Sequence, residues 1–168
     1  MMSDERTPRL ALPMLQPGQA QKEMTHNEAL ALLDIAVQTS VLAVGTNVPP
    51  VAPVAGNAWV VGTTPSGAWS GQARTIAGWT TSGWRFVVPG EGMAVWSVAD
   101  GQTARFGNGA WATGVLTGSR LTIGANNVVG TRRPAVVDPS GGTIVDVQSR
   151  TAILAILATL RGHGLIFA

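Results

Sequence analysis

Residues 84–98 read WRFVVPGEGMAVWSV, and this stretch decides the fold class. Two short runs rich in aromatic and β-branched residues, 84–88 and 94–98, stand on either side of Pro89-Gly90-Glu91-Gly92. Runs of this composition bounded by glycine and proline predict strands, and the short interval between them predicts a hairpin loop. We therefore expect two neighbouring strands of an antiparallel sheet here.

The surrounding residues 50–130 continue this pattern. Further strand candidates lie at 59–61, 74–76 and 121–123, and Ala99-Asp100-Gly101-Gln102 predicts a second turn. Glycine precedes most of the tryptophans by one or two residues, but at intervals too irregular for a propeller or solenoid. The expected fold is mainly β with flanking helices (α+β), built on a small antiparallel β barrel or sandwich rich in Trp and Gly.

The N-terminal flank predicts an arm followed by a helix. Pro8, Pro13 and Pro17 are too closely spaced for a helix, so residues 1–24 are expected to form an extended arm. Thr25-His26-Asn27-Glu28 has the spacing of a capping box and predicts a helix over 27–41, which Gly45 and Pro49-Pro50 would end. The apolar stripe of that helix consists of Leu30, Leu33, Val37 and Val41.

The C-terminal flank predicts a turn at 138–142 and a helix over 146–161, capped by Asp146 and ended by Gly162. A helix so poor in charge needs burial, either against the same helix of other subunits, which we favour, or beneath the β domain. The predicted domains are an N-terminal arm and helix (1–48), a β domain (49–133) and a C-terminal turn and helix (134–168). The residues expected to make oligomer contacts are Leu10, Leu12, Ile153, Ile156, Leu157 and Leu160.

Composition excludes several classes of partner and site. The 11 Lys and Arg against 9 Asp and Glu give a net charge of +2, and only 12% of residues are charged. The pI of about 10.4 follows from the absence of Tyr and Cys, and the arginines are scattered, so we expect no nucleic-acid partner. The absence of cysteine excludes disulfides and thiolate metal sites. No apolar run predicts a membrane span and no signal peptide is evident, so we expect synthesis in the cytoplasm.

Catalytic constellations are sparse. The two histidines, His26 and His163, lie near opposite ends of the chain. Glu23 and His26 have the spacing of a carboxylate-histidine metal site but lack the second such pair, so a surface or capping role suits them better. Glu91 and Asp100 could flank a sugar as a glycosidase pair, but both fall in turns where acids are common. We expect no enzyme activity, no cofactor and no metal site.

The tryptophans offer the clearest binding hypothesis, since the chain has six Trp and no Tyr. Exposed indoles stack on the apolar faces of sugars, so a carbohydrate-binding module that recognises host surface polysaccharide is the alternative function. Trp69, Trp79 and Trp111, surrounded by Gly, Ser and Thr, are the candidate glycan-binding residues. Trp59, Trp84 and Trp96 lie within apolar runs and are expected in the core.

Residues 7–13 and 19–34, with the Gly-Trp motifs up to Trp96, resemble a family of phage-type proteins from bacterial prophages and gene transfer agent clusters. The most specific part is Gln19-Ala20-Gln21-Lys22-Glu23-Met24-Thr25-His26-Asn27-Glu28. The resemblance implies a structural virion protein on the particle surface, either the base of a gene transfer agent head spike or a tail-fibre attachment component. Its expected partners are copies of itself, as a trimer or pentamer, a capsid vertex and a spike fibre. No catalytic residues come with the resemblance.

Overall fold

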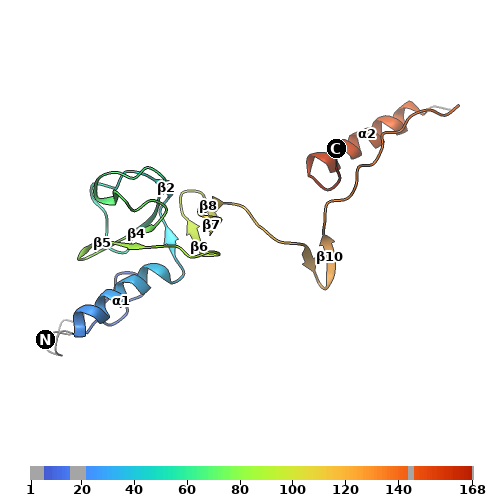
Figure 1. The fold of residues 1–168 in the computed structure, drawn as a ribbon. Coiled ribbons are helices and arrows are strands. Elements are labelled where there is room, and N and C mark those ends of the chain that lie inside the picture. The colour runs from blue at the N-terminus through green and yellow to red at the C-terminus, as the bar shows by residue number, and fades with distance from the viewer. Residues whose placement is uncertain (1–5, 16–21, 144–145, 168) are drawn as a thin grey trace. The chain divides into compact units, whose positions relative to one another are not determined.

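Two four-stranded sheets make up most of the N-terminal part of the chain in the computed structural model, which describes residues 6–15, 22–143 and 146–167 (Figure 1). The first sheet has the strand order β2 (Val44–Thr46), β3 (Ala58–Val61), β4 (Ile76–Thr80) and β5 (Gly83–Val87). The second has the order β1 (Ser40–Val41), β6 (Ala94–Ser97), β7 (Gln102–Gly107) and β8 (Ala110–Thr113). Pairing is antiparallel except for β2–β3 and β1–β6. In the described residues neither sheet closes into a barrel, and the mainly β, α+β class is confirmed.

The chain divides into two compact units, Met1–Val115 and Leu116–Ala168. The N-terminal unit contains both four-stranded sheets and helix α1 (Lys22–Ala36). The C-terminal unit contains a hairpin and helix α2 (Val147–Gly162). This division differs from the expected boundaries at 48/49 and 133/134, because α1 packs against β4 and β5 and so belongs to the body of the β unit.

One buried cluster joins the two sheets as the layers of a sandwich. Strand alternation turns Val60 and Ile76 of the first sheet, and Val95 and Ala104 of the second, into the same interior, where each is at most 2% exposed. Helix α1 adds Ile35 to this cluster. Gly78 makes that approach possible, because a Cβ there would lie 2.5 Å from Cδ1 and Cγ1 of Ile35. Both sheets and the helix thus share one core.

An aromatic cluster covers the opposite face of the first sheet. Trp59 of β3 and Trp84 of β5 lie on this face, and the short helix η1 (Gly67–Trp69) folds Trp69 down between them. The ring centroids are 5.6 Å apart for Trp59–Trp84 and 5.1 Å for Trp69–Trp84, both edge to face. Such pairs add roughly 0.5–1.5 kcal/mol each beyond the burial of apolar area. The first sheet is therefore covered on both faces.

Helix α1 begins before the predicted capping box, so that prediction is wrong. Thr25 and Glu28 lie inside the helix, and Glu28 accepts a hydrogen bond from Arg85 of β5 at 2.6 Å instead of capping. The helix ends at Ala36, and Thr39 then donates its hydroxyl to the Ile35 carbonyl. Gly45 and Pro49-Pro50 therefore play no part in ending it.

The predicted apolar stripe of this helix is also wrong. Asp34 and Ile35 are the buried positions, whereas Leu33 and Val37 are exposed. The fourth stripe residue, Val41, lies in β1 and is fully buried. The reason is that residues 39–46 leave the helix and run along both sheets, pairing β1 with β6 and β2 with β3.

The described part of the N-terminal arm is folded, contrary to the expected extended form. Thr7 donates its backbone N–H to the Leu12 carbonyl, and Arg6 pairs with Pro13 in an antiparallel bridge. The buried carboxylate of Asp34 accepts hydrogen bonds from the Thr7 hydroxyl (2.8 Å) and from the backbone N–H groups of Arg9 (3.0 Å) and Leu10 (2.6 Å). The described arm therefore lies against α1 of its own subunit.

The Arg9 side chain strengthens this attachment. Its guanidinium donates to the Asp34 carbonyl in the last turn of α1 and to the Gln38 carbonyl just after the helix. The last carbonyls of a helix have no partner within the helix and carry partial negative charge, which a cation stabilises. Met1–Glu5 and residues 16–21 lie outside the described residues.

The strand predictions are mostly confirmed, and one of the two turns predicted within the β domain is wrong. The runs at 59–61, 84–88, 94–98 and 121–123 all contain strands. The run at 74–76 overlaps β4 only at Ile76, where that strand begins. The predicted turn at 99–102 joins β6 to β7. Residues 89–92 do not form a hairpin loop, because β5 and β6 belong to different sheets.

The C-terminal unit begins with the antiparallel hairpin of β9 (Leu121–Ile123) and β10 (Asn126–Val129) and ends with α2 (Figure 1). The predicted helix and its cap are confirmed. Asp146 accepts the backbone N–H of Ser149 at 2.9 Å, and that bond and one from the Ser149 hydroxyl lower the pKa of Asp146 below its usual value. Neither helix in the described ranges has the length and hydropathy needed to cross a membrane.

Candidate functional site

The structure buries and exposes different tryptophan side chains from those that the sequence predicts. Trp69 is 0% exposed, so its assignment as a glycan-binding residue is wrong: the 3-10 turn folds it onto the first sheet rather than into solvent. Trp96 is 50% exposed, so its assignment to the core is also wrong. In β6, Val95 and Ser97 point inward, and strand alternation therefore places Trp96 on the outer face.

The remaining core assignments agree with the structure to different degrees. Trp59 is buried, as predicted. Trp84 is half-buried at the centre of the aromatic cluster. Trp79, a candidate binding residue, is half-buried and packs edge to face on Trp84, its cross-strand partner, at 4.9 Å. Its ring contributes mainly to the cluster.

Trp111 is the predicted binding residue that the structure places beside an open groove. The β7–β8 hairpin turns through Asn108 (φ +52°) and Gly109 (φ +71°), the residue pair that a type I′ turn favours. Two residues later, Trp111 donates its indole Nε1–H to the Arg74 carbonyl at 2.8 Å. Phe106, its cross-strand partner, meets the indole edge to face at 5.4 Å. The indole is therefore held on two sides.

The groove beside Trp111 has a volume of about 220 Å³, and we call it the Trp111 groove. Its walls come from β2, β3, β8 and the loops that flank them. The lining residues are Val44, Gly45, Asn47, Val60, Val61, Gly62, Thr63, Arg74, Ala110 and Trp111.

Two local features shape this groove. Arg74 has φ +65°, a left-handed conformation that is uncommon for a non-glycine residue and concentrated at functional sites. Gly62 lies so close to Asn47 and the Gly45 carbonyl that a Cβ could not be accommodated. Arg74 is the single charged residue among the described residues that line the groove.

A second surface, between α1 and the edge strand β5, is almost wholly apolar. Its lining includes Leu32 and Leu33 of the helix and Phe86 and Val87 of the strand. It lacks polar side chains that could orient a small molecule. This surface has the character of a protein contact rather than a ligand site.

The C-terminal unit exposes many of its apolar side chains. Ile153 and Ile156 are 45% and 59% exposed on α2, and Leu160 is half-buried. Leu157 is 6% exposed and covered within its own unit, so it is not available to another copy as predicted. In the arm, Leu10 is exposed and Leu12 is half-buried.

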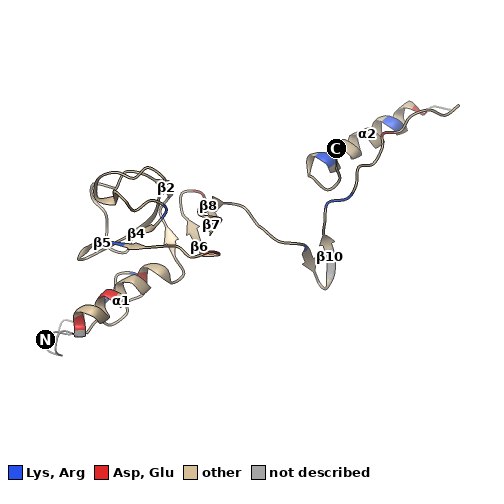
Figure 2. Cartoon of the chain, in the orientation of Figure 1, with Lys and Arg blue, Asp and Glu red and all other residues tan. Residues whose placement is uncertain are grey.

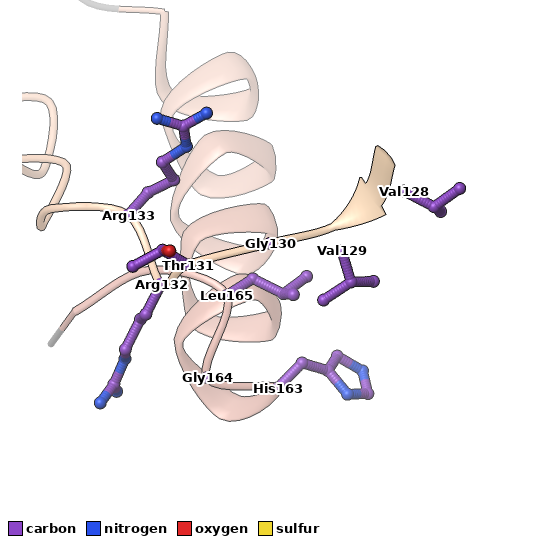
Figure 3. Close-up of a pocket in the computed structure, with 9 residues that line it drawn as sticks. All are labelled: Val128, Val129, Gly130, Thr131, Arg132, Arg133, His163, Gly164 and Leu165. Atoms are coloured by element: carbon purple, nitrogen blue, oxygen red, sulfur yellow. The ribbon is translucent and has the colours of Figure 1, made fainter. Parts of the chain in front are cut away.

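A hollow of about 560 Å³ in the C-terminal unit is shown in Figure 3. The side chains of Arg132 and Arg133 point in opposite directions, while Val129, Leu165 and His163 border the same space. The Arg132 guanidinium donates to the Ile166 carbonyl and lies 4.6 Å from the ring centre of Phe167. Since the two arginines do not converge, this hollow is not an anion site.

The structure also separates the candidate catalytic carboxylates. Asp100 lies in the turn before β7 and accepts a hydrogen bond from the Ser97 hydroxyl at 2.5 Å. Glu91 accepts a hydrogen bond from the backbone N–H of Asn108, which lies in the turn after β7. The intervening strand is about 20 Å long, well beyond the roughly 5–9.5 Å that separates glycosidase carboxylates. Asp100 thus makes a local turn contact, and Glu91 contacts a turn 17 residues further along the chain.

Charged residues are sparse along the strands (Figure 2). Glu23 and His26 both lie within α1, and no cluster of three or more His, Asp or Glu side chains suited to a metal ion occurs in the described ranges.

The fold and groove thus define a mixed α+β protein with a sandwich body and a cationic aromatic groove. Residues 26–112, which include all of the two four-stranded sheets except the last residue of β8, match the family described as "Protein of unknown function (DUF2793)", and the chain belongs to that family. Comparison with curated proteins gave no match.

Proposed function

We propose that this protein is a structural virion component of a phage-like particle. In this role it forms the base of a gene transfer agent head spike or attaches a tail fibre, and so links the capsid to a receptor-binding fibre. The resemblance of residues 7–100 to phage-type proteins supports this role. The protein then acts as a homo-oligomer on the virion surface.

The observation that carries the proposal is the exposure of apolar side chains in the C-terminal unit. Leu116 and Val137 are 96% and 91% exposed, and Ile123 and Ile156 about 60%. Isolated exposed apolar residues are ordinary, but contiguous apolar surfaces mark interaction sites. The α2 stripe of Ile153 and Ile156 is contiguous and has the spacing through which a second helix packs.

Imaging of the particle tests this role. A strain that produces particles would carry the chain with a C-terminal epitope tag, and purified particles would be labelled with antibody-bound gold. We expect gold at capsid vertices or at the tail-fibre attachment point, and particles from a strain lacking the gene should lose both the label and the projection. Intact, fully decorated particles without the chain would contradict the proposal.

A carbohydrate-binding module is the second candidate function, and the Trp111 groove favours it. The groove presents an indole held by Arg74 and Phe106, which lowers the entropy cost of stacking on a sugar. On a glycan array, Trp111→Ala should lose the signal of the native protein while remaining folded. Retention of the signal by the folded variant would exclude this groove.

A further inference from the structure

We propose that the Trp111 groove binds an acidic saccharide, with a sugar ring on the indole and the sugar carboxylate paired with Arg74. This inference rests on the second candidate function and names its ligand class. It is carried by three properties of the groove: a fixed aromatic surface, an arginine that forms no ion pair with a carboxylate of the described residues, and a volume of about 220 Å³.

The aromatic surface is fixed before any ligand arrives. The indole Nε1–H is already bonded to the Arg74 carbonyl, and the edge of Phe106 supports the ring. Part of Trp111 also packs against the core shared by the two sheets, while the side chain remains partly open to solvent. A sugar therefore meets a preorganised platform and loses little binding energy to ordering the site.

The backbone that carries the charged side chain is also held in place. The Arg74 backbone N–H donates to the Val61 carbonyl at 3.1 Å, and its carbonyl accepts from Trp111. These two bonds fix the left-handed backbone of Arg74, while its side chain is exposed. No carboxylate among the described residues forms an ion pair with this guanidinium. A ligand carboxylate would supply the planar partner that a guanidinium prefers.

Asn47 adds a neutral polar residue to the lining of the groove. Its Oδ1 accepts the backbone N–H of Thr64 at 3.0 Å, which orients the amide, and within the described residues its NH₂ group donates to no partner. That group is a donor for a sugar hydroxyl. The groove thus offers a stacking face, a cation and an oriented amide, which match a ring that bears hydroxyls and a carboxylate.

The size and charge of the groove disfavour other anionic ligands. Its volume of about 220 Å³ lies below the roughly 300–1,000 Å³ of pockets that enclose drug-sized ligands. Phosphate sites usually combine several backbone N–H groups or a helix N-terminus with the cation, and single-stranded nucleic acids follow an extended basic groove. Arg74 is the lone charged residue among the described lining residues, so the groove is not an extended basic groove of that kind.

The test is a titration of the full-length protein, followed through its tryptophan indole N–H signals by nuclear magnetic resonance. The probes are oligogalacturonide, alginate and hyaluronan oligosaccharides, with neutral galactan oligosaccharides as the uncharged comparison. We expect at least one acidic oligosaccharide to shift the Trp111 signal, assigned from Trp111→Ala, and to bind more tightly than galactan. Raising the salt concentration should weaken this preference.

The variants separate the parts of the proposal. Arg74→Gln should reduce affinity for the acidic oligosaccharide about tenfold or more, the usual size of a lost charged hydrogen bond, while leaving weak galactan binding unchanged. Arg74→Lys should restore part of the affinity. The matched control, Trp96→Ala, removes an exposed indole from the outer face of the second sheet and should have no effect.

Each outcome decides a different claim. Binding of acidic and neutral sugars with equal affinity, unchanged by Arg74→Gln, would overturn the acidic class but leave the carbohydrate-binding function standing. No shift with any of the four saccharides would overturn both. Loss of binding in Trp96→Ala but not in Trp111→Ala would place the site on the other sheet and contradict the assignment to this groove.

Discussion

Single residues decide which tryptophans hold the fold together and which meet the solvent. Trp84 contacts three other indoles, with ring centroids 4.9–5.6 Å away, whereas Trp96 projects from the outer face of β6. Both lie in apolar runs of similar composition, so the sequence does not distinguish them. Strand alternation and the placement of η1 do.

Trp84→Ala should therefore destabilise the protein by about 3–5 kcal/mol, the usual cost of removing a large aromatic side chain from a core. The expected mechanism is a cavity at the centre of the aromatic cluster. Chemical denaturation monitored by circular dichroism measures the free energy of unfolding. Trp96→Ala is the control and should change it by less than about 1 kcal/mol. Equal losses in the two variants would show that the cluster does not carry the stability assigned to it.

Gly78 matters for a different reason, the close approach of Ile35 from α1. In Gly78→Ala the new Cβ would lie 2.5 Å from the Ile35 side chain, and overpacking of this kind costs about 1–3 kcal/mol. Gly90→Ala is the matched control, since no atom lies within 4 Å of its Cβ position and its backbone is not left-handed. A differential scanning calorimetry experiment should show a lower melting temperature for the first variant only. Unchanged melting of Gly78→Ala would mean that α1 does not pack against β4 as described.

At the scale of elements, the N-terminal arm and α1 form one structure around Asp34. The carboxylate joins three donors of the arm, and Asn27 adds a reciprocal pair of hydrogen bonds with the backbone of Leu15. An isolated loop of this length has no core of its own. Its order depends on these contacts with the helix.

Asp34→Ala should release the arm, because Thr7, Arg9 and Leu10 lose their common acceptor. Such a loss typically costs about 1–3 kcal/mol. Brief trypsin digestion with mass spectrometry measures cleavage after Arg9, which should become markedly faster in the variant. Glu91→Ala, which removes an exposed acceptor of one backbone N–H, is the control and should cleave like the native chain. Slow cleavage in both variants would mean that other contacts hold the arm.

How much the sequence predicts also varies by element. Helix α2 is predictable because Asp146 and Gly162 mark its ends and no competing partner intervenes. The start of α1 is not, because Glu28, the second half of the apparent capping box, forms an ion pair with Arg85, 57 residues away. Strands β7 and β8 were not predicted. The Asn108-Gly109 pair between them is a strong hairpin signal and could have revealed them.

The candidate site shows the same limit. Trp111 could be selected from its Gly-Ala-Trp context, but the same context wrongly selected Trp69. The local pattern does not reveal whether a neighbouring element covers an indole. Arg74 and Asn47 could not be selected, because their role depends on a left-handed backbone and on the meeting of β2, β3 and β8.

At the scale of the whole molecule, the two units differ in how far they bury their apolar side chains. The N-terminal unit has a core between its sheets and an aromatic cluster outside them, and the described arm is attached within it. In the C-terminal unit, Leu157 and Ile166 are the buried apolar side chains among the described residues, while the other large aliphatic side chains are mostly exposed. We therefore propose that the C-terminal unit, rather than the described arm, mediates self-association.

The mass of the full-length protein in solution, measured by size-exclusion chromatography with light scattering, tests this claim most directly. The native chain of 17.3 kDa should elute with the mass of a trimer or pentamer, and Ile153→Asp combined with Ile156→Asp should shift it to the monomer without unfolding the sheets. Val51→Asp, at a fully exposed position of the N-terminal unit, is the control and should leave the oligomer intact. A native chain that remains a 17.3 kDa monomer at all concentrations would contradict the account.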